Sequence, residues 1–209
     1  MAGPDSAPGG PAWAWLVLGE AARRPGWDAA AALQEALRHG RQRARELRGR
    51  FGGASPWEMA TALGMAVVRS SEDPQVGWRQ RRSEYDPRRR RATLYTGAVE
   101  RLQEAAARFG LEEAFPRPVL EALPVAHELY HHLEATAGGP LSARHRRTWL
   151  RLGPLRLTLR EPALDEVAAH GFVQELCGLR LSPAVLDLAS LSPTPEAGAQ
   201  AGPAGPSAT

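Results

Sequence analysis

Apolar residues recur at helical spacing along much of this chain, and glycine or proline residues interrupt the pattern. The first helical stretch runs from Asp28, an expected N-cap, to Phe51, where Gly52-Gly53 ends it. Gly40 is expected to weaken the middle of this helix, because glycine is a poor helix former. The pattern therefore predicts one long helix near the start of the chain.

A second group of helices is predicted further along. Ser55 and Glu58 form a capping-box pattern around Pro56, so a helix should start there and run to about Gly64. Pro124 should either kink a later helix or mark the true start of its second half. The later helical stretches cover residues 97–109, 118–137, 162–178 and, with a weaker pattern, 183–191.

The segment between these helices has β character. Residues 65–69 are a short apolar run, and residues 76–85 and 91–96 flank the turn residues Asp86-Pro87, which predicts a hairpin. Residues 140–160 are interpreted as a loop with short strands at most. The chain is therefore expected to be an α+β protein, mostly helical, with a short β-sheet.

Composition narrows the class of protein. The 209 residues are 43% hydrophobic, enough for a packed core, and allow one domain with tails or two small domains. The single cysteine, Cys177, excludes a disulfide framework and fits a reducing compartment. All 26 cationic side chains are Arg, and Lys, Ile and Asn are absent, as a GC-rich coding sequence would produce. Because of this bias and a net charge of only +3, the Arg-rich stretches 41–50 and 79–91 make direct nucleic-acid binding a minor hypothesis.

The pattern divides the chain into four parts. Residues 1–12 and 192–209 are rich in Pro, Gly and Ala and are expected to be disordered tails. Residues 13–54 are interpreted as an N-terminal helical extension, and residues 55–191 as the domain that carries the chemistry. The apolar run at 13–19 is shorter than the about 20 residues of a membrane-spanning helix, and no basic signal-peptide start precedes it, so we expect a cytoplasmic protein.

The strongest functional motif is His127-Glu128-Leu129-Tyr130-His131, an HExxH sequence within a predicted helix. Residues four apart lie on the same face of a helix, so both imidazoles can reach one metal ion. Glu128 lies beside the first imidazole, where a carboxylate can act as general base in metal-assisted hydrolysis. The motif therefore predicts a zinc site.

A catalytic zinc site needs a third protein ligand and one open position. The preferred candidate is Glu166, on a predicted helix where the small residue Ala169 would allow close approach to the motif helix. Asp165 and His170 are alternatives, since Asp165 points about 100° from Glu166 on the helix whereas His170 shares its face. His170 could be a ligand, a partner of a ligand, or a residue at the rim of the site.

The two helices together resemble those of the ImmA/IrrE family of metallo-endopeptidases. The matching pieces are AHELYHH (126–132) and EVAAHGF (166–172), preceded by a similar strand-and-helix segment at 91–102. The resemblance covers roughly residues 55–185 and implies a small zincin-like domain with its sheet against the active-site helix. His170 is a departure, because the family commonly has Asn at this position.

The resemblance also implies a site and an activity. The zinc ligands would be His127, His131 and Glu166, with Glu128 catalytic. The reaction would be hydrolysis of peptide bonds in a specific intracellular protein, such as a helix-turn-helix transcriptional repressor. Two alternatives stay open: a regulatory binding module on a zincin scaffold that acts without proteolysis, and an Arg-rich nucleic-acid-associated protein.

Other polar residues receive simpler interpretations. His132 should face away from the metal, as a solvent or packing residue. Glu134 and Glu161 are interpreted as surface charges, and Cys177 as a small buried hydrophobe. The sequence does not choose the donor for a developing oxyanion, for which the candidates are Tyr85, Tyr95, Tyr130, His132, His145 and His170.

Overall fold

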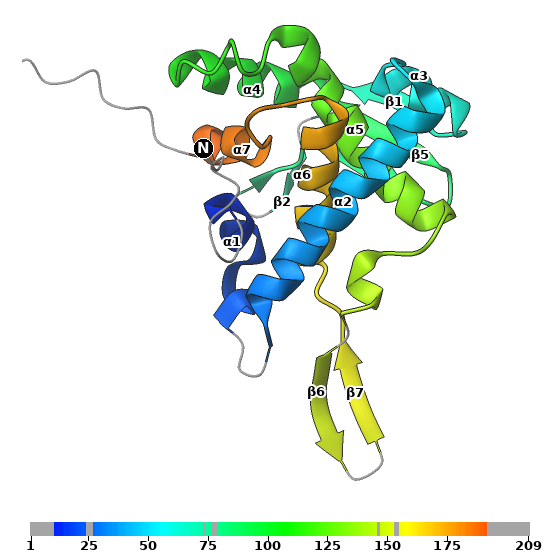
Figure 1. Cartoon of the computed structure of the whole chain (residues 1–209). Coiled ribbons are helices and arrows are strands. Elements are labelled where there is room, and N and C mark those ends of the chain that lie inside the picture. Colours follow the sequence, from blue (N-terminus) through cyan, green and yellow to red (C-terminus); the bar gives the residue numbers. More distant parts are fainter. Residues whose placement is uncertain are drawn as a thin grey trace, which may run out of the picture.

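The computed structural model describes residues 11–23, 27–72, 74–76, 79–145, 147–152 and 155–191, and it is an α+β protein (Figure 1). Of the predicted tails, residues 1–10 and 192–209 lie outside the described residues. The elements in chain order are α1 (Ala12–Leu18), η1 (Gly19–Arg23), α2 (Ala29–Phe51), α3 (Pro56–Ala62), β1 (Ala66–Ser70), β2 (Gln75–Val76), β3 (Arg79–Gln80), β4 (Ser83–Asp86), β5 (Arg91–Tyr95), α4 (Thr96–Arg108), α5 (Arg117–Thr136), η2 (Leu141–Ala143), β6 (Arg147–Leu152), β7 (Leu155–Leu159), α6 (Ala163–Leu176) and α7 (Ala184–Leu191).

A three-stranded sheet in the order β1-β5-β4 lies against the central helix α5. Strand β5 pairs in parallel with β1 and antiparallel with β4, which confirms the predicted hairpin. Asp86 closes its turn, because Oδ1 accepts the backbone N–H groups of Arg88 and Arg89 at 2.9 and 3.2 Å. In the described part of the chain, β4 is an edge strand of this sheet.

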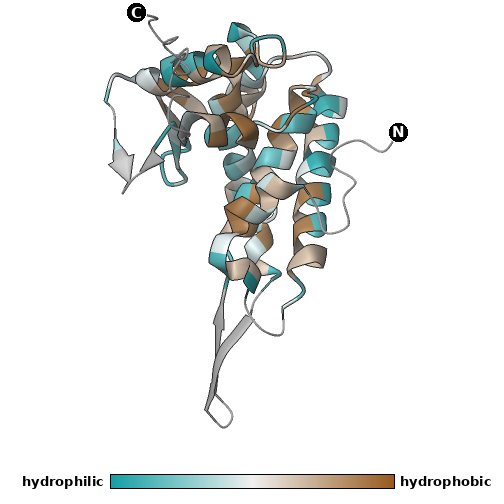
Figure 2. Cartoon of the chain, turned by 90° about the vertical axis from the view of Figure 1, so that its left-hand side faces the viewer, coloured by the Kyte–Doolittle hydropathy of each residue, from teal (hydrophilic) through white to brown (hydrophobic). Residues whose placement is uncertain are grey.

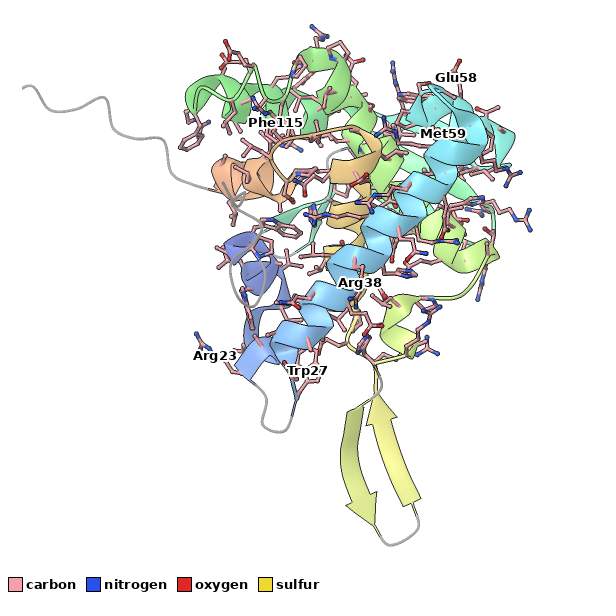
Figure 3. The ribbon with its side chains drawn as sticks, in the orientation of Figure 1. Arg23, Trp27, Arg38, Glu58, Met59 and Phe115 are labelled. Atoms are coloured by element: carbon pink, nitrogen blue, oxygen red, sulfur yellow. The ribbon has the colours of Figure 1, made fainter. Side chains whose placement is uncertain are left out.

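The predicted helix starts are confirmed by their caps. Asp28 Oδ1 accepts the N–H of Ala31 at 3.0 Å, which starts α2 at the predicted residue. Ser55 and Glu58 form a capping box at the start of α3, in which each side chain accepts the other residue's backbone N–H. On that helix exposed Glu58 and buried Met59 point to different sides (Figure 3).

Gly40 lies in the middle of α2 where that helix crosses α6. A Cβ atom at this position would lie 2.0 Å from the backbone oxygen of Ala168, closer than any real contact. Gly171 of α6 makes a similar approach to Leu37, with a would-be distance of 3.1 Å to its oxygen. Gly40 is thus more than a weak point in a helix, because it allows two backbones to approach closely.

The structure decides two points that the sequence left open. Helix α5 is continuous from Arg117 to Thr136 with Pro124 inside it, so Pro124 does not start a separate helix. Pro124 is buried, and its packing offsets the hydrogen bond that proline removes. The short strands allowed for in residues 140–160 are present as a hairpin of β6 and β7, where Arg and Leu alternate with the two-residue period of a strand. The hairpin extends away from the helices (Figure 1).

Arginine side chains of α2 hold this helix to α6. Arg45 pairs with the Glu175 carboxylate at 2.9 Å, and Arg48 donates to the Glu175 backbone oxygen at 3.3 Å. Arg41 donates to the Gln174 side chain at 3.4 Å. Part of the 41–50 basic stretch is therefore used within the fold.

The helices bury their apolar faces against one another. Seen from the side of α1 and α7, hydrophobic residues gather where helices meet, and hydrophilic residues lie mainly on outer faces (Figure 2). A search of the described residues finds no helix that is long and apolar enough to span a membrane. This architecture places α5 between the sheet on one side and α6 on the other.

Candidate metal centre

Helices α5 and α6 bring three candidate ligand atoms together. His127 and His131 lie one turn apart on α5, and their Nε2 atoms are 3.2 Å apart. Glu166, near the start of α6, places Oε2 3.3 Å from His127 Nε2 and Oε1 3.5 Å from His131 Nε2. The three residues predicted from the sequence therefore lie at the corners of a triangle, with a different Glu166 oxygen facing each imidazole.

The dimensions of this triangle suit a metal ion. Tetrahedral ligands at about 2.0–2.1 Å from a zinc ion lie about 3.3–3.4 Å from one another. The Nε2–Nε2 distance of 3.2 Å, and the distances of 3.3 and 3.5 Å from each Nε2 to the Glu166 oxygen that faces it, are close to that spacing. Two imidazoles and one carboxylate also leave a fourth position open. The group of His127, His131 and Glu166 can thus hold a metal ion.

The two alternative third ligands are directed elsewhere. Asp165 Oδ1 accepts the backbone N–H of Ser142 at 2.7 Å, which turns this carboxylate toward η2. His170 is buried with its ring edge-on to that of His127, at a centroid distance of 5.7 Å. Its Nε2 atom lies 3.6 Å from Asp187 Oδ2 on α7. The geometry therefore favours Glu166 as the third ligand.

Charges within the cluster stabilise one another. Burial alone would lower the pKa of His131. The hydrogen bond to Glu134 and the charges of Glu166 and Glu128 outweigh this effect and raise the pKa to about 9. Burial alone would raise the pKa of Glu166. Its hydrogen bond with His127 and the positive charge of the nearby imidazoles outweigh this effect and lower the pKa to about 2. Carboxylates that stabilise positive charge in this way also favour a divalent cation at the same place.

Glu128 lies beside the triangle and is buried, with 4% of its surface exposed to solvent. Its Oε1 atom accepts a 2.6 Å hydrogen bond from the hydroxyl of Ser83 on β4. This bond holds one oxygen of the carboxylate and leaves Oε2 for another partner. Ser83 carries no signal in the sequence, because it lies 45 residues before Glu128 and belongs to no motif.

Glu134 is buried, so its interpretation as a surface charge was wrong. Its Oε2 atom accepts a hydrogen bond from His131 Nδ1 at 3.0 Å, and its Oε1 atom accepts the Leu141 N–H at 3.2 Å. Helical spacing could have indicated this role, since Glu134 follows His131 by three residues. The Glu134 carboxylate therefore orients the His131 ring by binding the ring nitrogen that does not face the candidate centre.

His132 is a packing residue turned away from the triangle. Its Nε2–H donates to the Leu63 carbonyl at 3.1 Å, and its Nδ1 accepts the Tyr85 hydroxyl at 2.7 Å. Burial lowers the pKa of His132, which keeps the ring neutral in this arrangement. These bonds tie α5 to α3 and to β4.

The six candidate donors for a developing oxyanion differ in their position relative to the candidate centre. Tyr130 is buried behind His131 with a ring-centroid distance of 5.6 Å, and Tyr95 is also buried. His145 pairs with Glu35 at 3.2 Å, on α2. Of the six candidates, Tyr85 and His170 line the cavities described next.

Two cavities meet at the candidate centre. One, of about 610 Å³, lies toward α1, α4 and α7, and the other, of about 530 Å³, lies toward β4 and Pro140. Both are lined by Ser83, His127, Glu128 and Glu166. The cluster therefore lies on the floor of a cleft that continues on both sides of it.

Comparisons with known proteins identify no counterpart. No protein-family model, no curated protein and no solved structure matches the chain. The resemblance to ImmA/IrrE peptidases consequently stays a hypothesis that depends on two motifs, and the function is inferred from the geometry of the centre.

Proposed function

We propose that this protein is a zinc-dependent peptidase, with His127, His131 and Glu166 as zinc ligands. The observation that carries the proposal is the cluster of His127, His131 and Glu166 beside the buried carboxylate of Glu128. The two imidazole Nε2 atoms lie 3.2 Å apart, and each lies 3.3 or 3.5 Å from a Glu166 oxygen. Two nitrogens and one oxygen with an open fourth position are typical of catalytic zinc. When bound, zinc supplies Lewis acidity, which acidifies water and polarises a carbonyl group.

Glu128 is the catalytic residue of this proposal. Ser83 holds its Oε1 atom, so Oε2 is the oxygen that takes a proton from the attacking water. The same carboxylate then gives the proton to the amine nitrogen as the C–N bond breaks. Burial of Glu128 keeps bulk water from competing for this oxygen.

A peptide is the substrate that the cleft fits best. The cavities on both sides of the cluster suit a chain that crosses it rather than a compact small molecule. Edge strand β4 carries Ser83 and borders the cleft, so an extended peptide can pair with its backbone next to Glu128. The family resemblance suggests a helix-turn-helix regulator as the target, and the single Cys177 supports a cytoplasmic location.

The zinc content of purified protein tests the ligands. Wild type should hold about one zinc ion per chain by elemental mass spectrometry, and His127→Ala, His131→Ala and Glu166→Ala should lose it. Glu128→Gln and the matched control His145→Ala, whose imidazole pairs with Glu35, should keep it. A wild type without zinc, or unchanged zinc in His127→Ala, contradicts the proposal.

Cleavage of a protein substrate tests the activity. The zinc-loaded chain should cut a helix-turn-helix regulator encoded beside its gene, and Glu128→Gln should not, although it keeps zinc. If the zinc-loaded wild type leaves this protein intact and Glu128→Gln retains biological activity, the chain is instead a regulatory binding module.

A further inference from the structure

We propose that the cavity between α1, α4 and α7 binds a large apolar side chain of the peptide substrate, next to the bond that is cleaved. This inference rests on the proposed function and adds the substrate preference of the same site. It concerns α1 and α7, elements from opposite ends of the described chain that both contribute to the cavity wall.

The position of the cavity couples it to the candidate centre. His127, Glu128 and Glu166 form part of its wall, and the volume of about 610 Å³ extends from them toward α1 and α7. A peptide whose scissile carbonyl lies at the centre therefore directs a neighbouring side chain into this space. The volume is ample for a leucine or phenylalanine side chain with its backbone.

The wall formed by α1, α6 and α7 is predominantly apolar. Trp13 of α1 is buried there and lies edge-on to His170 at a centroid distance of 5.4 Å. The apolar residues that line the cavity include Trp13 and Val17 of α1, Val173 of α6 and Ala184 of α7, together with Leu102 of α4 and Leu123 of α5.

The mouth of the cavity exposes two leucines to solvent. Leu16 on α1 is 58% exposed, and Leu188 on α7 is 39% exposed. Among the described residues only Val68 and Phe109 are comparable exposed large apolar residues, and neither lines this cavity. Exposed apolar groups at the rim of a concave surface are typical of binding sites.

The charges of the cavity do not oppose an apolar occupant. Arg82 forms an ion pair with Asp187, and His170 faces the other oxygen of the same carboxylate. Besides Glu128 and Glu166 of the centre, the remaining charged lining residues are Arg101, Glu104 and Arg108, all on α4. An apolar side chain can thus enter between α1 and α7 without breaking the Arg82–Asp187 pair.

Amino-acid hydroxamates separate the metal centre from the cavity. Acetohydroxamate reports on the metal alone, whereas N-acetyl-alanine and N-acetyl-leucine hydroxamates add side chains of different size. By calorimetry on the zinc-loaded wild type, the leucine compound should bind about tenfold more tightly than the alanine compound. Equal affinities overturn the apolar cavity inference. If acetohydroxamate fails to bind, the proposed zinc function fails instead.

Surface variants then locate the preference. Leu16→Ser with Leu188→Ser should reduce the tenfold preference to about threefold or less, because the mouth no longer covers the leucine side chain. Both positions are exposed, so the fold should tolerate the changes, and unchanged acetohydroxamate binding verifies this. Phe109→Ser is the matched control, exposed to 38% but outside the cavity, and should keep the full preference. A full preference in the double variant rejects the assignment to this cavity.

Discussion

His131 Nδ1 donates a hydrogen bond to Glu134 Oε2 at 3.0 Å, so the neutral ring, which is the form that binds a metal ion, directs its Nε2 lone pair toward His127 and Glu166. A carboxylate can only accept here, so the bond selects the tautomer that a metal ligand requires. The other oxygen of Glu134 is occupied by the Leu141 N–H. Glu134 is therefore a positioning residue for a candidate ligand.

Removal of this support should weaken metal binding. Glu134→Gln keeps the shape but loses the charge and should lower zinc affinity about tenfold, and Glu134→Ala about a hundredfold. Competition with a chromophoric chelator measures the affinity. Glu46→Gln removes an exposed carboxylate from α2 and should leave the affinity unchanged. Wild-type affinity in Glu134→Ala would show that His131 needs no such partner.

The bond from Ser83 to Glu128 should matter for turnover and not for zinc. Ser83→Ala frees Oε1 of the carboxylate, so kcat should fall about tenfold while KM and zinc content change little. Ser83→Thr keeps the hydroxyl and should restore most of the rate. Steady-state kinetics on a cleaved peptide provide the measurement. Equal losses in the Ala and Thr variants would point to packing rather than to the hydrogen bond.

Two glycines of α2 should respond in opposite ways to alanine. Gly40→Ala forces a methyl group onto the Ala168 backbone and should lower the free energy of unfolding by about 1–3 kcal/mol. Gly49 lies on the same helix with nothing within 4 Å of a would-be Cβ, so Gly49→Ala should raise it by up to about 1 kcal/mol. Urea denaturation measures both changes. A harmless Gly40→Ala would mean that α2 and α6 can separate at no cost.

The thiol of Cys177 should be unreactive in the native protein. Burial raises its pKa to about 11, although the nearby Arg48 acts in the opposite direction. At pH 8 the thiolate fraction is then about a hundredfold below that of an ordinary thiol. Alkylation by iodoacetamide should be slower by about that factor than in denaturant, and its rate should keep rising up to about pH 11. Equal rates in native and denatured protein would contradict the partial burial of this side chain.

Local rules explain why much of the fold was predictable. The starts of α2 and α3 depend on Asp28 and on the Ser55–Glu58 pair, which act on backbone groups within three residues. The HExxH spacing likewise needs only the geometry of a single helix to place two imidazoles on one face. Glu166 required more, because its choice depended on the expected approach of its helix to the motif helix, a contact between segments far apart in the sequence.

Sequence alone thus determined most of the helices, the hairpin around Asp86 and the pair of candidate imidazoles, since all depend on neighbours a few residues apart. Tertiary structure decided that Ser83 donates a hydrogen bond to Glu128, that buried Glu134 accepts one from His131, and that Gly40 allows the close approach of α6. It also formed one cavity from the two ends of the described chain. These relationships join segments that are far apart in the sequence. The hydrophobic pattern shows which face of a helix is buried but not which other element covers it, because packing depends on the whole fold.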